Sequence, residues 1–218
     1  MLEVRHLSKR YGDDAVFSDV SLDVRPGEFV AIVGESGVGK STFLNCLAGL
    51  DSASEGSVKV QGTEISQMDD QSLAMFRRQH LGFVFQAFHV LPHLDVARNV
   101  ALPLMLLGQP DDARVSAALE AVGLGGLGTR MPQQLSGGQL QRVAIARAMI
   151  HKPAMILADE PTGNLDPETA EKIMDALVAQ TREHGAACVM VTHSQAAAGC
   201  ADRVLRLTRT GLHEATTH

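Results

Sequence analysis

The sequence predicts an α/β fold, in which helices flank a mostly parallel sheet, and two patterns carry this prediction. Short, almost wholly apolar runs lie at residues 28–33, 155–158 and 187–191. Such runs are typical of strands that are buried on both faces, as in a parallel sheet covered by helices. Between the last two runs, residues 167–183 carry apolar side chains at helical spacing. Strand, helix and strand within about 40 residues form a βαβ unit, which defines the α/β class.

Two other parts of the chain follow different patterns. Residues 18–24 and 57–60 alternate polar and apolar side chains, which predicts a small antiparallel sheet beside the main one. Residues 86–134 carry several prolines and helical patterns, which indicates an inserted α-helical subdomain. The polar residues from 208 onwards are expected to lack regular structure. We therefore predict one domain, 1–218, that divides into a core with the small sheet at 1–85 and 135–218 and a helical subdomain at 86–134.

Composition and charge exclude several classes of protein. The chain has 218 residues, 45% of them hydrophobic, and a formal net charge of −6. The negative charge argues against a nucleic-acid partner, because proteins that bind nucleic acids usually present a basic face. Three widely spaced cysteines without a CxxC pair predict neither a disulfide framework nor a zinc site. The most apolar stretch, residues 100–107, is too short to span a membrane, so we expect membrane contact only through a partner.

A phosphate-binding loop follows the first apolar run. Residues 34–41 read GESGVGKS and match the pattern G-x-x-x-x-G-K-[ST], before a helical pattern at 42–50. The glycines let backbone N–H groups approach phosphate oxygens, and the following helix adds its unpaired N–H groups. Lys40 supplies a positive charge to the β- and γ-phosphates, and Ser41 supplies a hydroxyl ligand for Mg²⁺. The core is therefore predicted to be a phosphate-loop NTPase, with nucleotide contacts from Gly34, Ser36, Gly37, Gly39, Lys40, Ser41 and Thr42.

Two acidic residues follow the apolar run at 155–158. Carboxylates at the carboxyl end of a parallel strand lie where α/β folds bind their ligands. Asp159 is expected to hold Mg²⁺, and Glu160 to act as the general base that polarises the attacking water. Alone, such a pair more often marks the start of a helix, but the phosphate loop favours the catalytic interpretation.

A glycine pair opens the helical pattern that begins near residue 137. Ser136 and Gln139 fit a capping box, so a purely structural role for Ser136, as the cap of this helix, is one interpretation. Consecutive glycines are poor helix formers, however, and Gly137 and Gly138 would allow the backbone to approach an anion closely. A second phosphate-binding helix end makes sense if it closes onto a nucleotide held by another copy of the chain.

The chain resembles an ATPase subunit of ABC transporters over nearly its whole length. Residues 135–139, LSGGQ, look like the signature that distinguishes this family from other phosphate-loop ATPases. The order of motifs also agrees: phosphate loop, a glutamine at Gln86 after the strand pattern at 81–85, signature, acidic strand end, and His193.

The resemblance implies roles for further residues. Tyr11 would stack on adenine, Asp166 would contact the opposite subunit, and His193 would bond the γ-phosphate. Gln86 would sense Mg²⁺ and the attacking water. The implied catalytic residues are Lys40, Gln86, Glu160 and His193, and the implied Mg²⁺ ligands are Ser41, Gln86 and Asp159. The nucleotide held by the partner copy would be contacted by Ser136, Gly137, Gly138 and Gln139.

The resemblance also implies partners and a place in the cell. Such ATPases form head-to-tail homodimers that sandwich two ATP, each with Mg²⁺, and drive an integral membrane permease from the cytoplasmic face of the inner membrane. Residues 82–92, 99–104 and 159–166 look like the lipoprotein-releasing, macrolide-exporter and cell-division branch, which transmits force through a permease of few spans. All catalytic elements are present, so active hydrolysis is expected.

Other functions remain open at this point. A solute importer or exporter would use the same ATPase with a multi-span permease. A soluble ABC protein acting on DNA or ribosomes is less consistent, because those relatives usually carry two cassettes or a long coiled-coil insertion. A metabolic kinase with the same phosphate loop would give no reason for residues 135–139.

Overall fold

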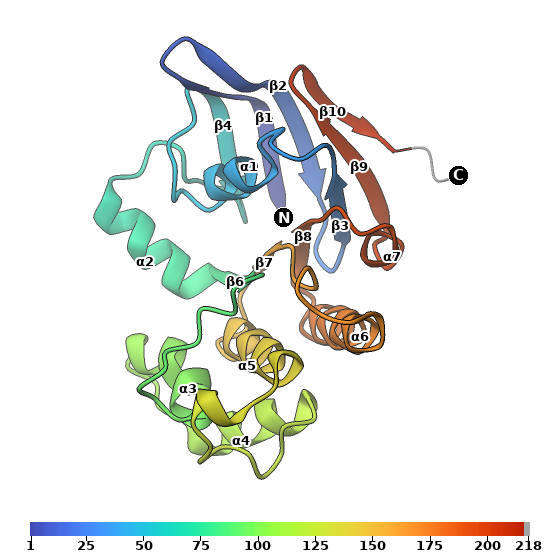
Figure 1. Ribbon diagram of the computed structural model, residues 1–218. Helices are drawn as coiled ribbons and strands as arrows, with labels where there is room; N and C mark the ends of the chain where they lie inside the picture. Colours follow the sequence, from blue (N-terminus) through green and yellow to red (C-terminus); the bar gives the residue numbers. More distant parts are fainter. Residues whose placement is uncertain (216–218) are drawn as a thin grey trace.

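The structure is a computed structural model, and it describes residues 1–215 of the chain. Figure 1 shows the two sheets and α1 (Lys40–Leu47) in its upper half, and the helices α3 (Val96–Leu106), α4 (Asp112–Ala121) and α5 (Gly137–Met149) in its lower half. Along the chain, helices and strands alternate one by one from residue 137 to residue 208, which is the part that supplies three parallel strands of the main sheet and the helices between them. This arrangement confirms the predicted α/β class with a phosphate-loop core.

A six-stranded sheet forms the centre of the molecule, in the order β10-β9-β3-β8-β7-β6. All pairings in it are parallel except that of β9 with β10. The predicted apolar runs are its inner strands, and every residue of β3 and β8 is buried. The strands are β3 (Phe29–Val33), β6 (Leu81–Phe85), β7 (Met155–Asp159), β8 (Ala187–Val191), β9 (Arg203–Thr208) and β10 (Gly211–Glu214).

A four-stranded antiparallel sheet lies beside it, in the order β2-β1-β4-β5, as the alternating patterns predicted. Its strands are β1 (Leu2–Tyr11), β2 (Asp14–Val24), β4 (Glu55–Val60) and β5 (Thr63–Glu64). The backbone N–H of Ser18 donates to the carbonyl of Arg209 over 3.0 Å, which ties β2 to the turn between β9 and β10.

Helices cover both faces of the central sheet. The helices are α1 (Lys40–Leu47), α2 (Asp70–His80), α3 (Val96–Leu106), α4 (Asp112–Ala121), α5 (Gly137–Met149), α6 (Pro167–His184) and α7 (Gln195–Ala198). Alternate residues of β3 face opposite sides: Val30 and Ile32 pack in a core with α1 and the antiparallel sheet. Ala31 packs instead in the core formed with the helices α3 to α7. The strand ends that carry the loops are therefore fixed from both sides.

The helical part of the chain includes α3 and α4, which pack together and against α5. Since α5 also packs on β6 and α6, it connects this part to the central sheet. The proposed division at residues 86 and 134 stays a prediction. Within residues 1–215, the helices are all too short or too polar to span a membrane.

The carboxyl-terminal segment differs from expectation. Residues from 208 onwards were expected to be irregular, but Gly211–Glu214 forms β10, paired with β9 in the register Gly211↔Thr208. The hydroxyl of Thr208 donates to the carbonyl of Gly211 over 3.0 Å and closes the turn. Leu212, the apolar side chain of β10, packs against the core between the central sheet and the antiparallel sheet. This contact and the pairing with β9 explain why the segment forms a strand although its other side chains are polar. Residues 216–218 lie outside the described part of the chain.

Candidate nucleotide-binding and catalytic site

The phosphate loop connects β3 to α1 and needs glycine at several positions. Gly37 and Gly39 have φ angles of 78° and 100°, in the left-handed region that glycine favours. A Cβ on Gly39 would also lie 2.3 Å from Cγ1 of Val16. The first turn of α1 has neither a side-chain cap nor an acidic residue. No side chain therefore occupies its first N–H groups or offsets the positive end of its dipole, which is what an anion-binding helix start requires.

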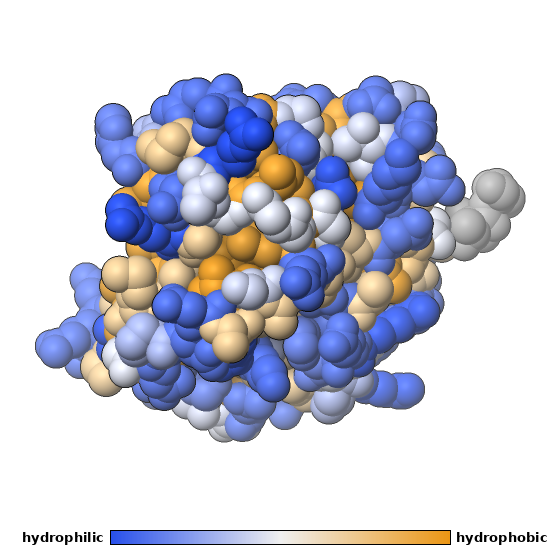
Figure 2. All heavy atoms as spheres, turned by 90° about the horizontal axis from the view of Figure 1, so that it is seen from below, coloured by the Kyte–Doolittle hydropathy of each residue, from blue (hydrophilic) through white to orange (hydrophobic). Residues whose placement is uncertain are grey.

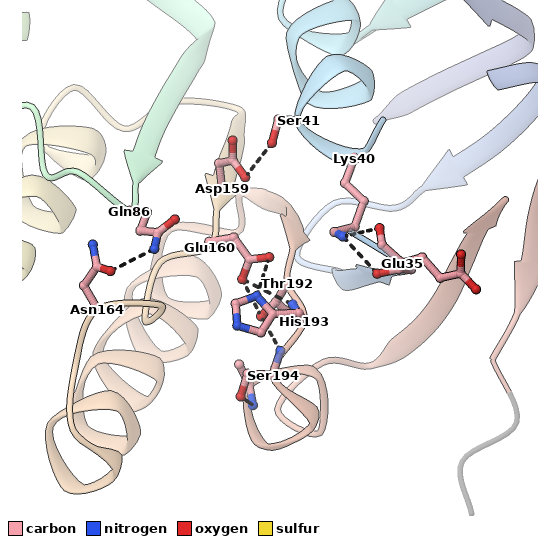
Figure 3. Close-up of polar contacts among 12 residues, drawn as sticks. Glu35, Lys40, Ser41, Gln86, Asp159, Glu160, Asn164, Thr192, His193 and Ser194 are labelled. Carbon is pink, nitrogen blue, oxygen red and sulfur yellow. Dashed lines mark hydrogen bonds and ion pairs between the residues drawn. The ribbon is translucent and has the colours of Figure 1, made fainter. Parts of the chain in front are cut away.

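Lys40 lies across this loop (Figure 3). Its ammonium donates to the carbonyls of Gly34 and Glu35, over 2.9 and 3.0 Å. Ser36 lies in the same loop, and Thr42 lies in the first turn of α1. The ammonium is thus held beside the N–H groups, where phosphate oxygens would replace the two carbonyls as its partners.

Ser41 and Asp159 form an oxygen pair between α1 and the end of β7. The Ser41 hydroxyl donates to Oδ1 of Asp159 over 3.1 Å. Burial raises the pKa of Asp159, the Ser41 hydrogen bond lowers it, and the nearby charge of Glu160 raises it further. A hydroxyl and a carboxylate are the hard oxygen ligands that Mg²⁺ prefers, and a partly buried carboxylate benefits from a cation. These two residues therefore fit Mg²⁺, which when bound supplies positive charge to the phosphates.

Glu160 follows Asp159 and is held by residues at the end of β8. Its backbone has φ 46°, and its N–H donates to the carbonyl of Val191 over 3.0 Å. Oε2 accepts from the Thr192 hydroxyl and from the His193 backbone N–H, each over 3.2 Å. Oε1 lies 2.9 Å from Nδ1 of His193. The Glu160 side chain is only 15% exposed, so these contacts hold its carboxylate in one orientation at the end of β7.

Gln86 lies beside this carboxylate pair. Phe85 pairs with Asp159 in the sheet, so Gln86 leaves β6 next to Asp159. Its side-chain amide donates to Oδ1 of Asn164 over 3.0 Å, and not to Ser41 or Asp159. The predicted contact of Gln86 with Mg²⁺ therefore stays a prediction.

The glycine pair opens α5, as its sequence indicated. Ser136 is the N-cap: its hydroxyl accepts from the Gln139 N–H over 3.3 Å, and the Gln139 side chain accepts from the Ser136 N–H over 2.9 Å. A Cβ on Gly138 would lie 2.4 Å from Cγ2 of Thr169, so packing on α6 requires that glycine. A Cβ on Gly137 would meet only ordinary contacts, the nearest at 3.6 Å. The capping interpretation thus explains Ser136, and packing explains Gly138, but neither explains Gly137.

Tyr11 and Asp166 occupy exposed positions. The Tyr11 ring is 55% exposed at the end of β1. Its hydroxyl donates to Asp51, which raises the Tyr11 pKa, and the Lys9 ammonium lies 4.5 Å from the ring centre. Asp166 caps α6 by accepting from the Thr169 N–H over 3.1 Å. The Tyr11 ring is therefore accessible to an adenine ring. That Tyr11 stacks on adenine stays a prediction.

Several residues of the site were not predicted from the sequence. Thr192, which donates to Glu160, and Asn164, which accepts from Gln86, were not among the predicted site residues. Gln141 is fully buried on α5 and donates to the carbonyl of Pro161 over 2.6 Å. A glutamine on the apolar face of an amphipathic helix is a signal that could have indicated this contact.

A phosphate loop after the first strand of a parallel sheet, an oxygen pair for Mg²⁺ and an adjacent held carboxylate define a nucleoside triphosphatase of the phosphate-loop class. The sequence pattern of the ABC transporter family matches residues 17–163. The chain belongs to this family, as its motifs indicated.

Named relatives agree with this assignment. The chain is 46% identical to the uncharacterized ABC transporter ATP-binding protein YbbA of Escherichia coli K12, over 98% of this chain and 97% of that one. It is 44% identical to the lipoprotein-releasing system ATP-binding protein LolD of Coxiella burnetii, over 95% and 92%. Among solved structures, the ATP-binding cassette MJ0796, a dimer in a post-hydrolysis state with ADP and Pi, superposes with a TM-score of 0.87. That cassette is 36% identical, and the match covers 100% of both chains.

Proposed function

We propose that this chain is the ATP-hydrolysing subunit of a membrane ABC transporter complex, and that two copies close head-to-tail on two ATP and two Mg²⁺. The observation that carries the dimer is the amino-terminal end of α5. Its glycine Gly137 has no packing reason to lack a side chain, and Figure 1 shows α5 in the half of the molecule away from α1. The end of α5 would therefore serve the nucleotide of another copy. MJ0796, which resembles the chain, is described as a dimer.

The residues of one copy have separate tasks in this proposal. The loop N–H groups and Lys40 bind the phosphates, and Ser41 with Asp159 holds Mg²⁺. Glu160 accepts a proton from the attacking water while Thr192 and His193 keep its carboxylate in position. Hydrolysis breaks the bond to the γ-phosphate and yields ADP and phosphate.

A groove between α2, β6 and α3 supports a membrane partner. It has a volume of about 460 Å³ and a largely apolar lining. Leu50, Leu91 and Leu106 are 51%, 45% and 61% exposed, and all three line this groove, so they form a shared apolar surface rather than scattered single side chains. Figure 2 shows the face seen from below, with apolar side chains gathered in its middle among hydrophilic ones.

The groove also carries polar atoms that lack partners within residues 1–215. Nε of Arg78 and Nδ1 of His151 are buried and make no hydrogen bond. Arg77 and Arg147 line the same groove. This chemistry suits a short cytoplasmic helix of a permease, with an apolar face and acidic or carbonyl groups that accept from the arginines. The chain would then lie on the cytoplasmic face of the inner membrane.

The branch is inferred from sequence likeness. Residues 82–92 and 159–166 look like those of the lipoprotein-releasing and macrolide-exporting ATPases, and LolD is a close relative in sequence. We infer a permease of few spans that transmits force to an extracytoplasmic domain. The alternative is a solute transporter whose permease has many spans.

A variant that binds but does not hydrolyse ATP tests the dimer. Glu160→Gln should be monomeric without nucleotide and dimeric in saturating Mg-ATP, as measured by light scattering coupled to size exclusion. The double variant Glu160→Gln with Ser136→Arg is the matched control: it should bind ATP and stay monomeric. A monomeric Glu160→Gln protein with bound ATP would refute the shared site.

Affinity purification from detergent-solubilised host membranes tests the partner. A permease of few spans with a large extracytoplasmic domain supports the proposed branch, and a many-span permease supports the solute transporter. Recovery only from the soluble fraction, without a membrane protein, contradicts both.

A further inference from the structure

The exposed ring of Tyr11 is held by two neighbouring side chains. Its hydroxyl donates to Oδ2 of Asp51, and the Lys9 ammonium donates to Oδ1 of the same carboxylate over 2.5 Å. The ammonium also lies over the Tyr11 ring, 4.5 Å from its centre. One carboxylate thus bridges two side chains of β1 that are two residues apart. Because the cation covers one face of the ring, the other face is left for a base.

The bridging carboxylate is itself tied to the helix that begins at the phosphate loop. Asp51 follows α1, and its backbone N–H donates to the carbonyl of Asn45 in that helix over 3.2 Å. Lys9 donates in addition to the carbonyl of Ser52 over 2.6 Å. The position of the Tyr11 hydroxyl is therefore fixed relative to α1, and so relative to the predicted phosphate-binding groups at the start of that helix.

Stability alone does not account for this arrangement. The Lys9 side chain is only 8% exposed. Burial acts to raise the pKa of Asp51, but the hydrogen bonds from Lys9 and Tyr11 outweigh it and lower the pKa, so the carboxylate is charged at neutral pH. A shielded ion pair of this kind is often no more stabilising than apolar side chains of similar volume. What the pair adds is a fixed direction for one exposed ring.

We propose that Lys9 and Asp51 are positioning residues, which hold the Tyr11 ring in the orientation that stacks on the adenine of ATP. The inference rests on the proposed function, because it concerns the base of the nucleotide that the phosphate loop would bind. Both residues act through Tyr11 and not on the phosphates. An exposed aromatic side chain without such an anchor samples several rotamers, and binding of the base would then have to select one of them.

Two ligands separate the base from the phosphates. The full chain is titrated by calorimetry with a non-hydrolysable ATP analogue and with inorganic tripolyphosphate, each with Mg²⁺, at concentrations where light scattering gives a monomer. Tyr11→Ala should weaken binding of the analogue by about 10-fold or more, as expected for the loss of stacking on one base. Tyr11→Phe keeps the ring and loses only the hydroxyl, so it should weaken that binding by about 3- to 5-fold. Neither variant should change the affinity for tripolyphosphate.

Asp51→Asn removes the bridge, because an amide has one acceptor oxygen and cannot accept from Lys9 and Tyr11 on separate oxygens. It should weaken binding of the analogue by about 3- to 5-fold but have no effect in the Tyr11→Ala background, and Lys9→Met should behave in the same way. Tyr11 is the only tyrosine, and the chain has no tryptophan, so intrinsic fluorescence reports this ring alone. A carboxylate that accepts from a tyrosine hydroxyl quenches its emission. Asp51→Asn without nucleotide should therefore emit more strongly than wild type.

The outcomes distinguish this inference from the proposed function. Wild-type affinity for the analogue in Tyr11→Phe and Asp51→Asn, equal weakening of the analogue and tripolyphosphate, or an equal loss in the Tyr11→Ala background overturns the inference while the proposed function stands. A wild-type chain that binds neither ligand overturns both. Asp51→Asn leaves Lys9 without its charge partner, so urea unfolding checks its stability. Tyr11→Phe keeps the pair of Lys9 and Asp51 and changes an exposed residue, so it tests the inference independently of folding.

Discussion

Nδ1 of His193 lies 2.9 Å from Oε1 of Glu160, while the other carboxylate oxygen accepts from the Thr192 hydroxyl and the His193 backbone N–H. The residues at the end of β8 therefore hold the carboxylate at the end of β7 through both of its oxygens. Neighbouring parallel strands end at the same edge of the sheet, so this contact follows from the pairing of Asp159 with Val191.

Thr192→Val tests the contribution of the hydroxyl to this arrangement. Thr192 is fully buried, and valine keeps its volume but removes the donor to Glu160 and the acceptor for the Ser194 N–H. We expect kcat to fall by about 3- to 10-fold with KM for ATP unchanged, and stability to fall by about 1–2 kcal/mol. Thr192→Ser, which keeps the hydroxyl, should retain kcat. A variant in which KM rises instead would show that Thr192 acts on nucleotide binding.

Lys40→Ala tests the phosphate loop. Within residues 1–215, the Lys40 side chain bonds only to carbonyls of its own loop, so its loss should leave the fold intact. We expect ATP binding to be lost and turnover to fall by about 100- to 1,000-fold, because a preorganised positive charge on the phosphates is removed. Fluorescent ATP titration and phosphate release measure the two effects, and circular dichroism checks the fold. Turnover near the wild-type rate would exclude the assigned site.

The inner strands could be predicted because burial on both faces makes every position apolar, as in β8. The strand β1 was not predicted, since register shifts after Val4 and Leu7 interrupt its alternation and His6 has φ 50°. The helix α2 gives a weak signal, because Phe76 is its one buried residue. Local sequence patterns report burial, and these elements are either irregular or mostly exposed.

The same distinction between local patterns and packing applies to the functional site. The phosphate loop is a local motif, so the sequence alone predicts that Lys40 and Ser41 lie at the start of the helix that follows the first apolar strand, as α1 shows. The acceptor of Gln86, in contrast, is Asn164, which the chain brings there only through the pairing of β6 with β7. Contacts between residues far apart in sequence depend on packing, and a single sequence does not display them.

Asp159→Asn tests whether the ionised, partly buried carboxylate of Asp159 lowers the stability of the folded chain. Burial raises the Asp159 pKa, so the ionised form is less favourable in the folded chain than in the unfolded one. The resulting loss of stability is present above the raised pKa and absent below the ordinary pKa of aspartate. Without nucleotide and metal, the variant should therefore be more stable than wild type at about pH 7, and the difference should vanish below about pH 4.

Urea unfolding at both pH values measures this difference. The same variant should lose metal-dependent ATP binding, because a neutral amide replaces the carboxylate ligand. The amide oxygen of the new side chain can still accept the Ser41 hydrogen bond, so Ser41→Ala serves to separate the hydrogen bond from the charge. Lower stability of Asp159→Asn at about pH 7 would contradict a net cost of ionisation.

Alanine should lower the stability of the chain at Gly138 but not at Gly137, the two glycines that open α5. In Gly138→Ala the new Cβ would lie 2.4 Å from Cγ2 of Thr169, and overpacking of this kind costs about 1–3 kcal/mol. Alanine has a higher helix propensity than glycine, which stabilises the variant by up to about 1 kcal/mol. The net loss of stability should therefore be about 1 kcal/mol. Thr169→Ser removes Cγ2 and should restore the stability of Gly138→Ala, as measured by urea unfolding.

Gly137→Ala meets only contacts of 3.6 Å and longer, so it should be as stable as wild type or slightly more stable. If the end of α5 binds the nucleotide of a second copy, the added methyl group should nevertheless weaken ATP-dependent dimerisation in the Glu160→Gln background. Loss of dimerisation without loss of stability would assign Gly137 to ligand contact. Dimerisation equal to that of Glu160→Gln alone would show that the phosphate does not approach this residue, because a Cβ there would occupy the space that the phosphate needs.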